Sequence, residues 1–113
     1  MSAFSAIVGA ITKQRGVTAC LVVAEEDGIV VDGTAQIGVD TAAFAALTAS
    51  LYRKATRAAD AAGFGAVSFC ELEAEQGRVL AAGHNGLVIV AVAEPRVNLG
   101  LVRVEMLRAA ASL

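Results

Sequence analysis

The stretch DTAAFAALTASLYRKATRAADAAG, from Asp40 to Gly63, decides the fold that we expect for this chain. Its apolar residues recur at steps of three and four, which is the spacing that an amphipathic helix buries. Asp40 is the expected N-cap, because its carboxylate can accept from free backbone N–H groups of the first turn. Gly63 is the expected end, since glycine takes the left-handed conformation without a Cβ penalty. The expected buried stripe consists of Phe44, Leu47, Leu51, Ala55, Ala58 and Ala62.

The side chains beside this stripe indicate a second packing partner for the helix. No charged residue occurs from Thr41 through Tyr52, whereas a surface helix normally has a charged outer face. Because one small domain offers one core, we expect this second face to pack on another helix, such as the same helix of a second copy. Its residues are mostly small: Ala45, Thr48, Ala49 and Tyr52.

Composition supports a single domain, 1–113, that hides surface in an oligomer. The 113 residues are 57% hydrophobic and only 18% charged, against about 25% charged in typical domains. A small domain with few charges tends to cover apolar surface by association. The net charge of −2 argues against nucleic acid as a partner.

We expect a cytoplasmic protein that does not insert into a membrane. The most apolar run, Leu87 to Ala93, is far shorter than the roughly 18 residues that a spanning helix needs. No basic region precedes the first apolar residues, so a signal peptide is not expected. Cys20 and Cys70 fall in expected strands and are interpreted as buried thiols in a reducing compartment; a disulfide between them is the alternative, which the spacing does not support.

The remaining segments predict an α+β domain in the order α-β-β-α-β-β-β-α. Asp27-Gly28 predicts a two-residue type I′ hairpin turn, and Glu75-Gln76-Gly77 and Asn85-Gly86 predict two further antiparallel hairpins. Asp32-Gly33 indicates either a bulge or an early end of the strand pairing. Residues apolar on both faces indicate two inner strands, so helices should cover both faces of the sheet. The expected helices outside 40–63 are 2–14, capped by Ser2, and 99–113, capped by Asn98; the expected strands are 17–25, 29–35, 66–74, 78–82 and 87–93, with a loop at 36–39.

Three segments together resemble the roadblock / dynein light chain family. They are RGVTACLVVAEEDGIVV (Arg15 to Val31), FAALTASLYRKA in the long helix, and NGLVIVAVAEPRVNLGLVRVEML (Asn85 to Leu107). The resemblance covers nearly the whole chain. It is most specific in the last segment, where an apolar strand and a proline lead into the turn that opens the final helix.

The resemblance implies a definite topology and a homodimer. The five strands would follow the order second, first, fifth, fourth, third, with the long helix on one face and the terminal helices on the other. The edge strand 66–74 would pair with its copy, so that the sheet continues across the dimer and the long helices pack side by side. The residues expected at this interface are Ala45, Thr48, Ala49, Tyr52, Val67 and Phe69.

The resemblance also implies a function without catalysis. Family members include dynein light chains, scaffold subunits that recruit Ras-like GTPases, and bacterial regulators of the mutual gliding motility protein B type, which accelerate GTP hydrolysis by rearranging the GTPase. We therefore expect a non-catalytic homodimeric adaptor for a Ras-like small GTPase, without a cofactor or metal. The alternatives are a structural light-chain or scaffold subunit without GTPase contact, and a small-ligand sensor, which the apolar inner strands disfavour.

One basic patch is the candidate partner-binding site. Arg53, Lys54 and Arg57 lie in the second half of the long helix, where positive charge also favours the helix dipole. Both interpretations stay open, because arginine is common at interfaces as well. Arg103 is expected to make a salt bridge or a carbonyl contact within the fold.

The other polar residues predict no chemistry. His84, the only histidine, is expected in a turn, and the common catalytic and zinc-binding signatures are absent. The acidic run Glu25-Glu26-Asp27 could hold a cation, but three adjacent groups in a turn favour a solvated loop.

Overall fold

The computed structural model of the chain describes residues 4–35 and 40–113. It confirms the predicted order of helices and strands and the predicted α+β class. The elements are α1 (Ser5–Thr12), β1 (Val17–Ala24), β2 (Val30–Ala35), α2 (Thr41–Ala61), β3 (Cys70–Ala74), β4 (Gly77–His84), β5 (Leu87–Ala93) and α3 (Leu99–Ala110).

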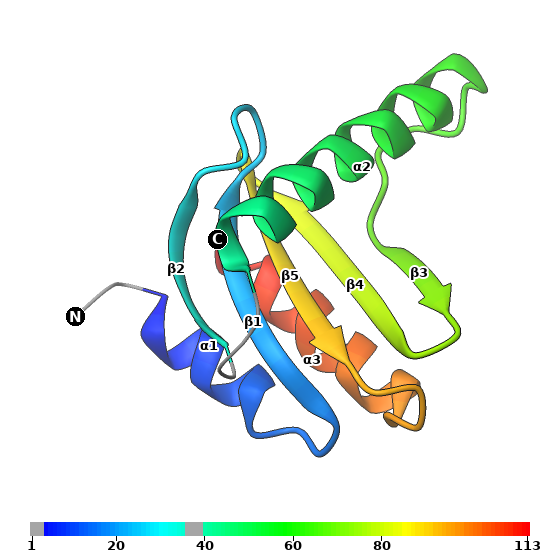
Figure 1. Ribbon diagram of the computed structural model, residues 1–113. Helices are drawn as coiled ribbons and strands as arrows, with labels where there is room; N and C mark the ends of the chain where they lie inside the picture. The colour runs from blue at the N-terminus through cyan, green and yellow to red at the C-terminus, as the bar shows by residue number, and fades with distance from the viewer. Residues whose placement is uncertain (1–3, 36–39) are drawn as a thin grey trace.

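One antiparallel sheet of five strands forms the middle layer (Figure 1). Its order is β2-β1-β5-β4-β3, as predicted, so that β2 and β3 are the two edges. Helix α2 lies on one face, and α1 and α3 cover the other. The inner strands β1 and β5 are buried along almost their whole length, which explains why both of their faces are apolar.

The sheet separates two hydrophobic cores. The core on the α1 and α3 side contains Val8, Ile11, Cys20, Val22, Leu80, Ile89, Val102, Met106 and other apolar residues. The core under α2 is smaller and contains Leu21, Val23, Ala45, Ala49, Tyr52, Ala81, Val88 and Val90. The buried leucine and valines of the second core come from the strands. Helix α2 contributes two alanines and Tyr52.

The caps of α2 are as predicted. The Asp40 carboxylate accepts from the backbone N–H of Ala43 at 3.1 Å, and Gly63 has a positive φ of 75° just after the helix. The predicted burial of its faces is wrong. The side chains that face the sheet belong to Ala45, Thr48, Ala49 and Tyr52, which are at most 4% exposed.

The predicted stripe lies largely outside the core: Leu47 is 72% and Leu51 39% exposed. Small residues occupy the inner face because the helix lies very close to its neighbours. A Cβ on Gly28 of the β1–β2 loop would lie 2.8 Å from the Cα of Ala46. The leucines therefore point away from the chain's own core.

Two hairpins differ in their turns. Asn85 and Gly86 have φ of 54° and 75° between the paired residues His84 and Leu87, which is the two-residue type I′ geometry. The same turn predicted at Asp27-Gly28 is wrong, because Asp27 does not take a positive φ and the connection is longer. A bulge is present one residue before the predicted Asp32-Gly33: these two residues pair regularly, and Val31 is the extra residue.

Strand β3 is shorter than predicted, because a tyrosine hydroxyl occupies the place where its ladder would continue. Cys70 pairs with Ala81, so a continued ladder would bring Phe69 opposite Ala82 and then Ser68 opposite Gly83. Instead, the Gly83 N–H donates to the Tyr52 hydroxyl at 3.1 Å, and this hydroxyl donates to the Val67 carbonyl at 2.9 Å. A side chain thus replaces one rung between the strands.

The terminal helices agree with the prediction apart from their ends. The described part of α1 begins at Ser5 and ends at Thr12, and the proposed cap Ser2 and the loop 36–39 lie outside the described residues. Asn98 caps α3 by accepting from the Leu101 N–H at 3.1 Å. None of the described helices has the length and apolar character needed to cross a bilayer.

Candidate interaction surfaces

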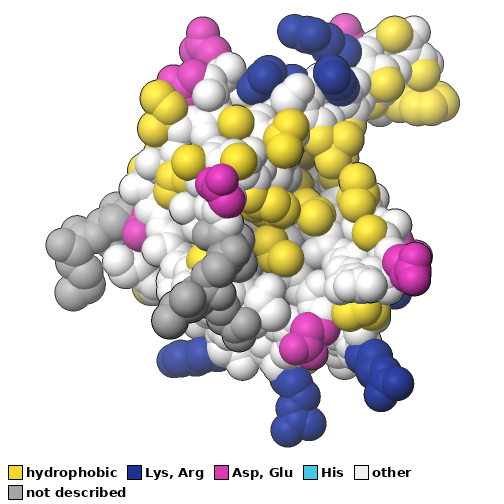
Figure 2. All heavy atoms as spheres, viewed as in Figure 1, with side chains coloured by type: hydrophobic (Ala, Val, Ile, Leu, Met, Phe, Trp, Pro, Cys, Tyr) yellow, Lys and Arg dark blue, Asp and Glu magenta, His cyan; other side chains and the backbone are white. Residues whose placement is uncertain are grey.

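An apolar groove runs between α2 and the β3–β4 hairpin. Its volume is about 310 Å³. All three leucines that line it are exposed, and the exposed fraction of Leu72 is 42%. Figure 2 shows the hydrophobic side chains gathered below α2 on this face. The groove adjoins β3, whose outer edge has no strand beside it in the described sheet. It is lined by Phe44, Leu47, Thr48, Leu51, Leu72 and Val79.

The residues predicted for the dimer interface do not form one surface. Ala45, Thr48, Ala49 and Tyr52 are shielded by the chain's own sheet, and Val67 packs on the edge of the same core. Phe69 packs on the core across the sheet, where the Arg103 guanidinium lies 5.4 Å from its ring centroid. Arg103 thus has a structural role, but its partner is an aromatic ring instead of a carboxylate or carbonyl.

Sequence reasoning assigned the groove leucines to the core. Leu47 and Leu51 have the helical spacing of a buried stripe, and periodicity alone does not say which of two apolar faces meets the sheet. The useful signal was the size of the side chains, because a helix that packs closely on a sheet of bulky residues has room only for small ones.

The basic patch is divided between two roles. The Arg53 guanidinium donates to the backbone carbonyls of Glu25 and Glu26, at 2.5 and 3.1 Å, and so ties α2 to the β1–β2 loop. Lys54 and Arg57 are exposed and form no ion pair with any described residue. Both belong to the second half of α2, and the end of this helix extends past the sheet in Figure 1.

The acidic residues of β3 lie on the face opposite the groove. Arg78 of β4 pairs with Glu71 at 2.5 Å and with Glu73 at 3.2 Å. Because side chains alternate along a strand, Leu72 between them points to the α2 side. One arginine therefore neutralises part of the charge at an open edge while the groove stays apolar.

The two thiols lack the features of reactive cysteines. Burial, with a smaller contribution from Asp32, raises the pKa of the Cys20 thiol to about 12, and burial also raises the pKa of Cys70. A reactive cysteine needs a lowered pKa. They are free thiols packed on opposite sides of the sheet, so neither can reach the other.

Burial of the Tyr52 ring raises the pKa of its hydroxyl, although the hydrogen bond from Gly83 acts in the opposite direction. The hydroxyl therefore stays protonated near neutral pH and can donate to Val67. Tyr52 was expected at the dimer interface. Its role in the structure is instead to join α2 to Val67 and Gly83 through its hydroxyl.

The remaining candidates have no arrangement for chemistry. His84 is exposed at the end of β4, as expected for a turn. In the acidic run, the Asp27 carboxylate accepts from the Ile29 N–H at 3.0 Å and so shapes its own loop. Across residues 4–35 and 40–113, no three potential ligands come together to hold a metal ion.

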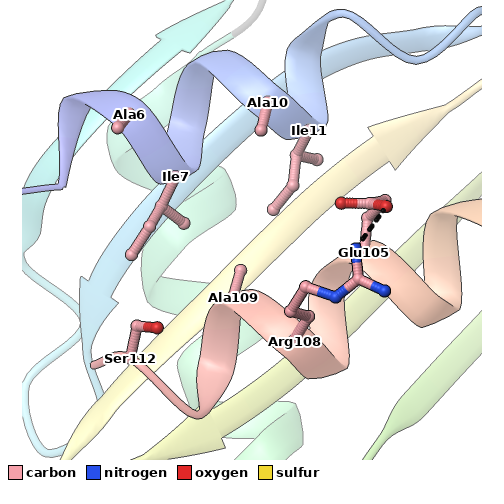
Figure 3. A pocket seen from close by; sticks show the side chains of 8 residues that line it. All are labelled: Ala6, Ile7, Ala10, Ile11, Glu105, Arg108, Ala109 and Ser112. Carbon is pink, nitrogen blue, oxygen red and sulfur yellow. Dashed lines mark hydrogen bonds and ion pairs between the residues drawn. The ribbon is translucent and has the colours of Figure 1, made fainter.

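A second groove, of about 240 Å³, lies between α1 and α3 on the other face of the sheet (Figure 3). Its walls are mainly alanine and isoleucine, with Ile7 and Ala10 on α1 and Ala109 on α3. Glu105 and Arg108 already pair with each other at 3.3 Å on its rim. The groove thus offers little polar chemistry for a ligand.

Two archaeal proteins are similar to this chain in sequence. The uncharacterized proteins MJ0310 and MJ1340 of Methanocaldococcus jannaschii are each 30% identical to it over 100 residues. The matches cover 88% of this chain and 87% of each relative. No protein-family model matches the sequence.

Solved structures of the roadblock/LC7 type have the same fold. A roadblock/LC7 domain from Streptomyces avermitilis has a TM-score of 0.87 and 17% identity, covering 98% of this chain and 94% of its own. Myxococcus xanthus MglB has a TM-score of 0.83 and 22% identity, covering 97% and 93%. A structure described as MglB with a tetrameric arrangement has a TM-score of 0.85 and 18% identity, covering 96% and 82%.

Proposed function

Since the chain belongs to the family of the two Methanocaldococcus jannaschii proteins and has the roadblock/LC7 fold, we propose that it is a non-catalytic homodimeric adaptor that binds and regulates a Ras-like small GTPase. The observation that carries this proposal is the apolar groove of α2 beside an open sheet edge. The fold shared with MglB supports the choice of partner.

The groove and the edge together fit a second copy of the chain. Strand β3 can pair with its copy across the open edge, which removes unpaired backbone groups from solvent. Leu47 and Leu51 can then pack against the groove of the second copy, and full burial of a leucine contributes about 1.5–3 kcal/mol. The interface of the proposed dimer thus consists of the exposed stripe of α2 in place of its alanine-rich face.

The proposed partner docks on the helix side of this dimer. Lys54 and Arg57 remain the proposed partner-binding cations. Arg53 is no longer among them, because its guanidinium already binds the β1–β2 loop. We propose that any effect on GTP hydrolysis comes from reshaping the GTPase, in keeping with the non-catalytic role proposed for this chain. The proposed compartment is the cytoplasm, where free thiols such as those of this chain stay reduced.

The dimer is tested with Leu47→Glu combined with Leu51→Glu. We expect the wild-type chain to elute at twice its mass of 11.4 kDa in light-scattering chromatography, and the variant as a monomer. Leu101→Glu with Val104→Glu is the matched control, since these residues are equally apolar and exposed but lie on α3 across the sheet. A wild-type monomer at micromolar concentration would contradict the proposed dimer.

The adaptor function is tested with purified Ras-like GTPases from the same genome, each loaded with GDP or a non-hydrolysable GTP analogue. We expect one of them to bind, and Lys54→Glu with Arg57→Glu to weaken this binding at least tenfold. Lys13→Glu with Arg15→Glu makes the same charge change at exposed positions after α1 and should have little effect. If no GTPase binds in either nucleotide state, the proposed function is wrong.

A further inference from the structure

The loop after α2 presents a phenylalanine to solvent on a well-defined turn. Gly63 and Gly65 have φ of 75° and 84°, and Phe64 lies between them. The Phe64 N–H donates to the Ala59 carbonyl at 2.9 Å, and the Gly63 N–H donates to the Asp60 carbonyl at 3.0 Å. These two bonds form a Schellman motif, which fixes the backbone on which the ring is carried.

The fold makes no use of this ring. In a Schellman motif the residue at the Phe64 position often packs back onto the last turns of its helix. Here the side chain is 83% exposed, the highest value of any large hydrophobic residue that the structure describes. An aromatic residue fixed by its backbone but left in water is the type of residue that anchors protein interfaces.

The loop behind the ring is held in place from the core. Tyr52 is buried under α2, and its hydroxyl donates to the Val67 carbonyl, three residues beyond Phe64. The chain segment that carries the ring is therefore fixed at both ends, by the helix stop and by Tyr52. Binding through this ring needs little ordering of the loop, which favours affinity.

Two basic residues, Lys54 and Arg57, lie on the helix that precedes Phe64. They lie one turn apart in the second half of α2, and no described residue forms an ion pair with them. Figure 2 shows basic side chains and hydrophobic ones near each other at the end of α2 that projects from the sheet. A surface that complements them has an apolar pocket bordered by carboxylates.

We propose that Phe64, with Lys54 and Arg57, forms a docking knob that inserts into a carboxylate-bordered apolar pocket on the GTPase. This inference rests on the proposed function and names the part of the surface that gives specificity. Two cations are fewer than the four to eight that typify binding to anionic membranes, so a protein fits the knob better than a lipid surface. The groove that fits the second copy is separate, because α2 continues about 15 Å from Leu51 to its end.

The first test measures binding and mass together. We expect Phe64→Ala to weaken binding of the GTPase at least tenfold, Phe64→Leu to restore part of it, and every variant to keep the wild-type mass. Ile29→Ala is the control, since Ile29 is also exposed (63%) but lies on the β1–β2 connection. Unchanged binding by Phe64→Ala would overturn the proposal, and loss of the dimer would assign Phe64 to the second copy instead.

The second test does not depend on a GTPase being found. Phe64→p-benzoylphenylalanine is activated by light in cells, and the products are identified by mass spectrometry. A cross-link to a GTPase supports both proposals. A cross-link to another protein supports the knob alone if Lys54→Glu with Arg57→Glu abolishes it. Cross-linking only to a second copy, or no product at all, would overturn the knob, as would Phe64-dependent binding to phosphatidylglycerol vesicles.

Discussion

Replacing Tyr52 with phenylalanine removes one oxygen atom and two hydrogen bonds that join α2, β4 and the loop before β3. The hydroxyl accepts from the Gly83 N–H at 3.1 Å and donates to the Val67 carbonyl at 2.9 Å. Both backbone groups lie beyond the last residue pair of the β3–β4 ladder, Cys70 and Ala81, so the substitution removes the hydroxyl to which each of them bonds. The ring itself keeps its place, and no cavity larger than the hydroxyl forms.

The magnitude follows from the burial of these groups. A buried donor or acceptor left unpaired costs about 1–3 kcal/mol, and both bonds here are partly buried, so water can satisfy part of the loss. We expect Tyr52→Phe to lower the free energy of unfolding by about 2 kcal/mol. With a denaturant slope of about 1–3 kcal/mol per molar urea, the midpoint should fall by roughly 1 M.

The assay is urea unfolding at one fixed protein concentration, since dimerisation changes apparent stability. Hydrogen exchange adds a local reading, because the Gly83 amide should lose protection. Thr56→Val is the control: its hydroxyl donates to the Tyr52 carbonyl within the same helix, so its removal should cost less than about 0.5 kcal/mol. If Tyr52→Phe is as stable as the wild type and Gly83 stays protected, the inserted hydroxyl does not hold the sheet edge.

Three further predictions concern single side chains. Gly83→Ala should destabilise the fold by about 2 kcal/mol in thermal or urea unfolding, because its Cβ would lie 2.7 Å from the Tyr52 ring; wild-type stability would contradict this packing. The raised pKa of Cys20, about 12 against 9.0, means that stability is complete below pH 9 and declines up to pH 12, by about 3 kcal/mol at pH 11. When the free energy of unfolding of Cys20→Ala is measured from about pH 9 to about pH 12, it should lack this contribution to the decline. If the wild type and the variant lose stability with pH at the same rate, the raised pKa of Cys20 is refuted. Arg53→Met should cost about 1 kcal/mol by loosening the β1–β2 loop, whereas Arg57→Met should be within 0.5 kcal/mol of wild type by the same unfolding assay.

The sequence by itself determined the order of elements, the strand order implied by the family resemblance, and the caps of α2. These depend on local rules: an aspartate at an N-cap, a glycine in a left-handed turn, and runs of residues apolar on both faces. The hairpin at Asn85-Gly86 followed from the same rules, whereas the type I′ turn that they predicted at Asp27-Gly28 did not form. The order of elements could be predicted because most local preferences agree with the fold.

Only the tertiary structure decided which face of α2 meets the sheet. The leucines and the alanines both lie on uncharged faces, and the choice depends on how much volume the strands already fill. The groove of Leu47, Leu51 and Leu72 could not be predicted for the same reason, since its strand and helix residues are distant in the sequence.

The different roles of the residues in the basic patch likewise depend on contacts that the local sequence does not indicate. Arg53, Lys54 and Arg57 look alike in the sequence, but only Arg53 lies within reach of the β1–β2 carbonyls. Tyr52 ends β3 early because its hydroxyl meets Gly83 and Val67, 31 and 15 residues away. Periodicity reports the neighbours of a residue along the chain, whereas these roles depend on neighbours across the sheet.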